Sequence, residues 1–158
     1  MKNLISLVLF VLIIGACNSG GKQQNNADTS ASDTTAMVAH VRDGVFIHIT
    51  EGYNDPHRVL MPLKMATMMA GDKDVLVYMD IHAVELLVKG AKDMQYADFE
   101  SAQAYIKKLL DKNVGIYACP TCLKIAGFKE SDLLAGVQLA QKDKFFNFTK
   151  GRIVNLDY

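Results

Sequence analysis

Two cysteines separated by two residues, Cys119 and Cys122, have the spacing in this sequence that best suits chemistry. They follow residues 114–118, whose β-branched and aromatic side chains favour a strand. Pro120 suits the first position of a helix, so Cys119 is predicted to be the N-cap, where free N–H groups and the helix dipole favour a thiolate. Cys122 lies one turn further on, within reach of Cys119. The pair predicts thiol or sulfur chemistry, with a structural or incidental pair as the alternative.

A second group of candidates follows the strands that precede the cysteines. In a parallel sheet, ligands gather at the carboxyl ends of the strands, so Thr50, Glu51, Asp80 and His82 could share a pocket with Cys119. A histidine in such a pocket would stabilise a thiolate. Asp80 and His82 are equally well explained as turn and capping residues.

The remaining histidines and the methionines suggest packing rather than chemistry. His48 lies inside an apolar stretch and is predicted to be a hydrogen-bonded core histidine, whereas His57, in a first helical turn, is predicted to be solvated. Four methionines at helical spacing could bind a soft metal, but a core or subunit interface is the preferred interpretation. They are Met61, Met65, Met68 and Met69. We therefore expect no metal and no cofactor.

Strand and helix patterns alternate along the chain, which predicts an α/β fold with a largely parallel sheet. Asp55 and Asp98 are predicted to cap helices, and Asn113 is predicted to supply a left-handed exit from the second of these. We expect strands at 44–50, 74–80, 114–118, 136–140 and 152–158, with helical segments at 55–70, 82–88, 98–112, 123–126 and 143–149.

The first residues have the pattern of an export signal. Lys2 precedes an apolar run too short to span a bilayer, and Ile14-Gly15-Ala16-Cys17 resembles the lipobox of bacterial lipoproteins. The resemblance implies cleavage before Cys17 and lipidation of that cysteine, which would anchor the protein to a membrane of the bacterial cell envelope, outside the cytoplasm. An ordinary secretory signal or an uncleaved anchor is the alternative. We expect a signal over 1–16, a flexible tether over 17–40 and one domain over 41–158.

Charge argues against nucleic acid as a partner. The sequence holds 17 basic and 17 acidic residues and contains no basic run. No second apolar segment is long enough to span a membrane. The residues at 41–158 suffice for one domain with its own core.

The order and spacing of these segments resemble the DsrE/DsrF-like family. The resemblance is carried by residues 44–50, 55–80 and 109–123, and by the later run from Gly127 to Ala140. It implies a three-layer α/β/α sandwich with a mainly parallel central sheet of about five strands. It also implies homo-oligomers and a cysteine that carries persulfide sulfur between a donor and an acceptor protein. Cys119 stands at the position of that cysteine.

This chain departs from the pattern of the family in two ways, and it also differs from the thioredoxin fold. The family's sulfur relays are cytoplasmic, whereas this chain carries an export signal. Cys122 favours disulfide exchange, because a neighbouring thiol would discharge a persulfide on Cys119 or close a disulfide with it. The thioredoxin fold is rejected, because two strands precede the cysteines and no proline follows Pro120.

Two functions from different classes follow. The first is a membrane-anchored thiol protein that carries sulfane sulfur, with Cys119 attacking and Cys122 as the resolving thiol; thiol-disulfide oxidoreduction is a variant of it. The second is a non-catalytic oligomeric binding module whose two cysteines rest as a disulfide. Whether the chain is an enzyme stays open at this point.

Overall fold

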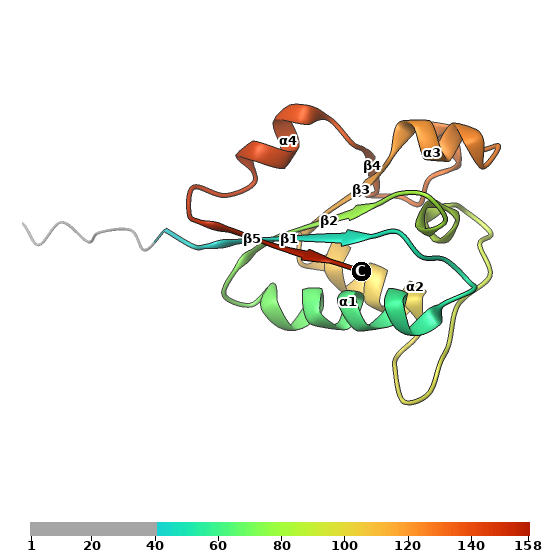
Figure 1. Cartoon of the computed structure of the whole chain (residues 1–158), viewed down its shortest axis with the longest axis horizontal. Helices are drawn as coiled ribbons and strands as arrows, with labels where there is room; N and C mark the ends of the chain where they lie inside the picture. Colours follow the sequence, from blue (N-terminus) through green and yellow to red (C-terminus); the bar gives the residue numbers. More distant parts are fainter. Residues whose placement is uncertain (1–40) are drawn as a thin grey trace, which may run out of the picture. The chain divides into compact units, whose positions relative to one another are not determined.

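The structure is a computed structural model that describes residues 41–158. The predicted signal, Cys17 and the predicted tether lie outside the described residues. Within them the chain alternates strands with helices, as the sequence pattern predicts (Figure 1). The elements are β1 (Gly44–Ile49), α1 (Pro56–Met69), β2 (Asp74–Met79), the 3-10 helix η1 (Ala83–Leu87), α2 (Ala102–Asp111), β3 (Gly115–Ala118), α3 (Pro120–Ile125), the 3-10 helix η2 (Glu130–Asp132), β4 (Gln138–Leu139), α4 (Lys142–Asn147) and β5 (Ile153–Asp157).

All five strands form one parallel sheet in the order β4-β3-β2-β1-β5. The strands predicted at 44–50, 74–80 and 114–118 are parallel neighbours at its centre, so that prediction is confirmed. Helices α1 and α2 lie on one side of the sheet, and α4 and α3 lie on the other (Figure 1). The fold is therefore the predicted α/β sandwich, and all strands point their carboxyl ends in one direction.

The two long helices begin at capping side chains. Asp55 accepts the backbone N–H of Arg58 at 3.2 Å and caps α1. The prediction that Asp98 caps α2 is wrong. The hydroxyl of Ser101 accepts the Ala104 N–H at 3.3 Å, and α2 begins directly after Ser101. Both aspartate and serine can cap, so the sequence pattern allowed either start, and the chain turns once more before the helix begins.

The two faces of the sheet differ in how completely they are covered. On the α1 and α2 side, Ile47 and Ile49 of β1 are fully buried. On the other side, Phe46 and His48 of the same strand are only half-buried. Strand β1 is therefore fully covered on one face only, because the short helix α4 contributes no buried residue and contacts Phe46 through Phe145.

Of the four methionines of α1, only Met69 packs against the hydrophobic core. Met68 is 67% exposed, and the other three are only partly covered. The interpretation of these side chains as core is confirmed for Met69 alone, because the buried stripe of α1 is made by other residues. These are Val59, Leu60, Pro62, Leu63 and Ala66. A role in a subunit interface stays a prediction.

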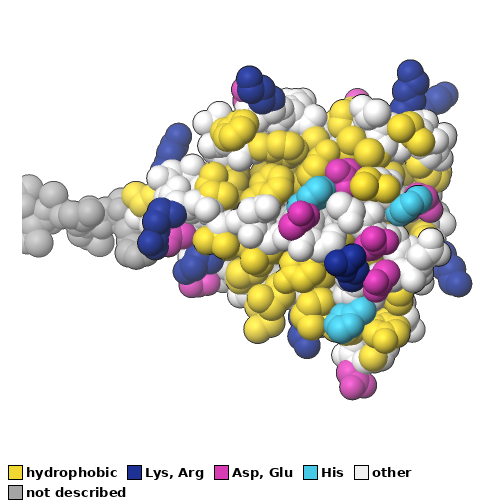
Figure 2. All heavy atoms as spheres, in the orientation of Figure 1, with side chains coloured by type: hydrophobic (Ala, Val, Ile, Leu, Met, Phe, Trp, Pro, Cys, Tyr) yellow, Lys and Arg dark blue, Asp and Glu magenta, His cyan; other side chains and the backbone are white. Residues whose placement is uncertain are grey.

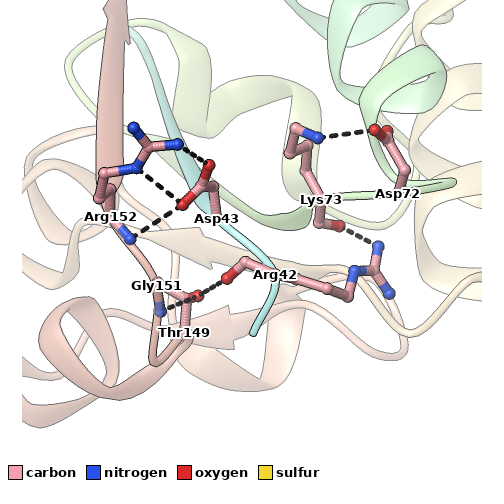
Figure 3. A network of polar contacts seen from close by, with 7 residues as sticks. All are labelled: Arg42, Asp43, Asp72, Lys73, Thr149, Gly151 and Arg152. Atoms are coloured by element: carbon pink, nitrogen blue, oxygen red, sulfur yellow. Dashed lines mark hydrogen bonds and ion pairs between the residues drawn. The ribbon is translucent and has the colours of Figure 1, made fainter. Parts of the chain in front are cut away.

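Strand β5 is fastened beside β1 by the polar network in Figure 3. The Arg152 guanidinium donates to both carboxylate oxygens of Asp43, and the Thr149 hydroxyl donates to the Arg42 carbonyl oxygen at 2.8 Å. A Cβ on Gly151 would meet the Arg42 carbonyl, so glycine is required there by close backbone approach. The network places β5 next to the strand whose carboxyl end contributes to the candidate site.

Candidate functional site

The two cysteines lie on the turn from β3 into α3, at the carboxyl end of the sheet. Cys119 is the N-cap, and its sulfur accepts the backbone N–H of Cys122 at 3.4 Å. Its own N–H donates to the carbonyl of Met79 at 3.0 Å, which ties the turn to β2. Pro120 occupies the first helical position, where its missing N–H costs nothing. The predicted N-cap position of Cys119 is confirmed, and both thiols are free.

Hydrogen bonds favour the thiolate of Cys119. Burial by itself raises the pKa of this half-buried thiol, but the Cys122 N–H, which donates to the sulfur at 3.4 Å, and the Tyr78 hydroxyl, the Cys122 thiol and the Thr121 N–H lower the pKa. Together they outweigh burial and bring the pKa of Cys119 below its usual range. The N-cap position contributes in the same direction, since it exposes the sulfur to unpaired helix N–H groups.

The opposite shift applies to Cys122. Burial and the hydrogen bond from its thiol to Cys119 raise the pKa of Cys122, and the nearby carboxylate of Asp80 adds to the effect. Only the backbone N–H of Ile81 acts against them. The pair is therefore asymmetric: Cys119 is the more acidic thiol and Cys122 the less acidic one.

Tyr78 is the site residue that sequence reasoning missed. It lies on β2 directly opposite Tyr117 of β3, with His48 of β1 on its other side. Its ring stacks on His48 at 5.2 Å between centroids and meets the edge of Phe145 at 5.0 Å, and its hydroxyl lowers the pKa of Cys119. Burial and the negative sulfur raise the pKa of Tyr78, so the hydroxyl stays protonated and can donate. A tyrosine directly after the aliphatic run 75–77 of the strand was the available signal.

His48 bridges two carboxylates at the carboxyl end of the sheet. Its Nε2 lies 3.0 Å from Asp80 Oδ1, and its Nδ1 lies 2.8 Å from Asp157 Oδ1. The first contact lacks hydrogen-bond alignment and acts as a charge contact when the imidazole is protonated. The predicted core position of His48 is wrong, because 24% of its side chain is exposed on the thinly covered face.

The other predicted pocket residues divide into two sets. His82 lies with Cys122 at one small cavity, and Asp80 is close enough to raise the pKa of Cys122. Thr50 instead donates its hydroxyl to the carbonyl of Tyr158 at 3.1 Å and does not line that cavity. Glu51 lies 3.9 Å from Arg58, near the surface. His57, which was predicted to be solvated, is exposed; its ring stacks on Tyr96 and is tilted against Phe99.

Acidic and histidine side chains gather on the side of the molecule where the strands end (Figure 2). Among residues 41–158, no three His, Cys, Asp or Glu side chains are grouped so that they could hold a metal ion. Nor does that part of the chain contain a helix with the length and apolar character needed to cross a bilayer.

Comparison with known proteins identifies the fold and the family. Residues 43–151 match the model of the DsrE/DsrF-like family. The ychN protein from E. coli is 17% identical in sequence and superposes with a TM-score of 0.60, covering 73% of this chain and 99% of its own. The protein MTH1491 from Methanobacterium thermoautotrophicum, titled as a protein of unknown function, is 20% identical, with a TM-score of 0.51 and coverage of 72% and 98%. No curated protein matches the chain.

Proposed function

This chain belongs to the DsrE/DsrF-like family, a family of the sulfur-relay type, and from that premise we propose that it carries sulfane sulfur on Cys119, with Cys122 as the resolving thiol. The observation that carries the proposal is the asymmetry of the pair. The pKa of Cys119 is lowered, whereas the pKa of Cys122 is raised. Cys119 is therefore suited to act as the nucleophile and Cys122 as the resolving thiol.

The proposed cycle needs no external oxidant or reductant to load sulfur. The Cys119 thiolate attacks the outer sulfur of a donor persulfide, the S–S bond of the donor breaks, and the donor leaves as a thiolate with the bonding electron pair. An acceptor thiolate then attacks the outer sulfur of the Cys119 persulfide, and Cys119 leaves as the thiolate. Where no acceptor is present, the Cys122 thiolate attacks the inner sulfur, closes a disulfide and releases hydrosulfide.

The second candidate function is a binding module whose cysteines rest as a disulfide. The family's oligomers and the exposed Met68 of α1 are compatible with it. A reduction potential well below about −300 mV would mark a structural bond and favour the module. A higher potential would mark a working pair, whether in sulfur transfer or in thiol-disulfide exchange.

The proposal places this chemistry at a membrane of the bacterial cell envelope. Lipidation of Cys17 would hold the domain outside the cytoplasm, with residues 17–40 as the tether. The donor or acceptor would then be a thiol protein of the same compartment. We also propose that the domain assembles with copies of itself.

Loading with inorganic polysulfide, followed by intact-protein mass spectrometry, tests the carrier role. The reduced wild-type domain should gain the mass of one sulfur atom transiently, and Cys122→Ser should accumulate the loaded form. Cys119→Ser should gain none. Sulfur uptake that persists in Cys119→Ser would overturn the assignment of Cys119 as the carrier and favour the binding module. As an independent check, Cys119 should be alkylated faster than Cys122 at mildly acidic pH, and equal rates would contradict the asymmetry.

A further inference from the structure

A small cavity opens beside the resolving cysteine and is not used by the proposed cycle. Its volume is about 360 Å³, at the lower end of the range of ligand pockets. Two isoleucines dominate its rim: Ile125 of α3 is 81% exposed and Ile81, after β2, is 53% exposed. The full lining is Ile81, His82, Glu85, Cys122, Ile125 and Ala126. Large aliphatic side chains left in water next to a reactive pair favour an apolar ligand.

The backbone at Ile81 is strained in a way that serves this cavity. Its φ is +45°, a left-handed conformation that β-branched residues rarely adopt. The turn is held in place because the Ala83 N–H donates to the Asp80 carbonyl at 2.8 Å and the His82 N–H donates to the Thr50 carbonyl at 3.1 Å. The Ile81 N–H lowers the pKa of Cys122, and the Ile81 side chain lies on the cavity rim. Strain of this kind concentrates at functional sites.

The charges around the cavity exclude an anionic ligand. Glu85 lines it, Asp80 lies close to Cys122, and no lysine or arginine belongs to the lining. The one group that can be cationic, His82, already lies 3.8 Å from Glu85. A carboxylate or sulfonate on the ligand would face like charge without a partner.

We propose that this cavity binds the organic half of the sulfur donor, and that this half is a short, uncharged aliphatic chain. The inference rests on the proposed function, because it assigns the substrate of the same cysteine pair. The donor is an alkyl persulfide, R–S–SH. The Cys119 thiolate attacks its outer sulfur, the S–S bond breaks, R–S⁻ departs with the bonding pair, and the proton stays on the transferred sulfur. The chain R lies past Cys122, between Ile81 and Ile125.

N-alkylmaleimides of increasing chain length test the cavity, because they share one reactive group and differ only in the alkyl chain. The reduced domain is treated with the N-methyl to N-butyl compounds, and the modified cysteine is identified by peptide mass mapping. Each methylene that enters the cavity should raise the rate at Cys119 by up to about fourfold relative to a free thiol. We expect a gain of at least about tenfold from methyl to butyl. A chain of equal length ending in a carboxylate should react more slowly than the N-butyl compound.

Two variants separate the cavity from general surface effects. Ile125→Ser should reduce the gain with chain length to about threefold or less, and the fold should tolerate it because this side chain is mostly in water. Met68→Ser is the matched control, since it makes a similar change at another exposed apolar residue, on the opposite layer, and should keep the full gain.

The outcomes distinguish the two proposals. A Cys119 that reacts faster than a free thiol, with a rate independent of chain length, overturns the cavity assignment and leaves the carrier role standing. A gain that persists in Ile125→Ser also overturns it. A Cys119 no faster than a free thiol toward the N-methyl compound counts against the carrier role, while a chain-length gain in the same experiment would still support an apolar ligand site.

Discussion

Replacing Tyr78 with phenylalanine removes a single hydroxyl group, the one whose interaction with the sulfur lowers the pKa of Cys119. A hydrogen bond to a charged group contributes about 1.5–3 kcal/mol, or roughly 1–2 pK units. Since this sulfur is only half-buried, solvent screening favours the lower end. We therefore expect the pKa of Cys119 to rise by about one unit in Tyr78→Phe.

Because of this shift, the pH–rate profiles of disulfide exchange for wild type and Tyr78→Phe should cross. Below both pKa values, one unit costs a tenfold loss of thiolate, but the more basic thiolate is roughly threefold more nucleophilic, so the variant should be about threefold slower. Above both values both proteins are fully ionised, and the variant should be about threefold faster. The assay is release of a coloured thiol from an aromatic disulfide across a pH series, under single-turnover conditions.

Tyr117→Phe is the matched control for this experiment. Tyr117 faces Tyr78 on the neighbouring strand, and only burial raises its pKa, so its hydroxyl has no part in the cysteine site. Its removal should leave the pH profile of Cys119 in place. Parallel profiles for wild type and Tyr78→Phe, without a crossover, would refute the role of the tyrosine hydroxyl and leave the helix N-cap as the cause of the lowered pKa.

Three further outcomes follow from the sequence and the packing. Ser101→Ala should lower the free energy of unfolding by about 1 kcal/mol, measured by urea denaturation, whereas Asp98→Ala should change it little because that side chain caps no helix. Gly151→Ala should lower the free energy of unfolding by about 1–3 kcal/mol, seen as a lower denaturation midpoint, because the added methyl group has no space. Gly71→Ala should be tolerated, because the atom nearest to its added methyl group would be 3.9 Å away. Cys17→Ser should abolish fatty-acid labelling in cells; absence of label on the wild type would contradict the anchor.

The sequence sufficed for those features that depend on local chemistry. Pro120 directly after Cys119 was enough to predict the N-cap, because a proline at that position leaves the preceding side chain facing the free N–H groups. Largely apolar runs predicted the central strands, because a parallel strand in the middle of a sheet is flanked by covering elements on both faces. The order of the elements then left few possible topologies.

The features that the sequence did not predict depend on contacts across the fold. Tyr78 reaches Cys119 only because β2 and β3 pair in one particular register, which hydrophobicity alone does not define. The left-handed backbone of Ile81 runs against the preference of a β-branched residue, so propensity rules pointed away from it. The thin cover over His48 depends on how far α4 extends over the sheet, and only the structure shows that.

The pairing of β1 with β5 sets an order of events during synthesis. Arg152 and Asp43, which fasten the two strands together, are 109 residues apart in the chain, so β1 leaves the ribosome long before its outer neighbour exists. Until then the backbone groups along that edge of β1 are open to pairing with other chains. Completion of the sheet is therefore a late, non-local step, and we expect the domain to fold slowly and to need protection from aggregation while the chain is being made.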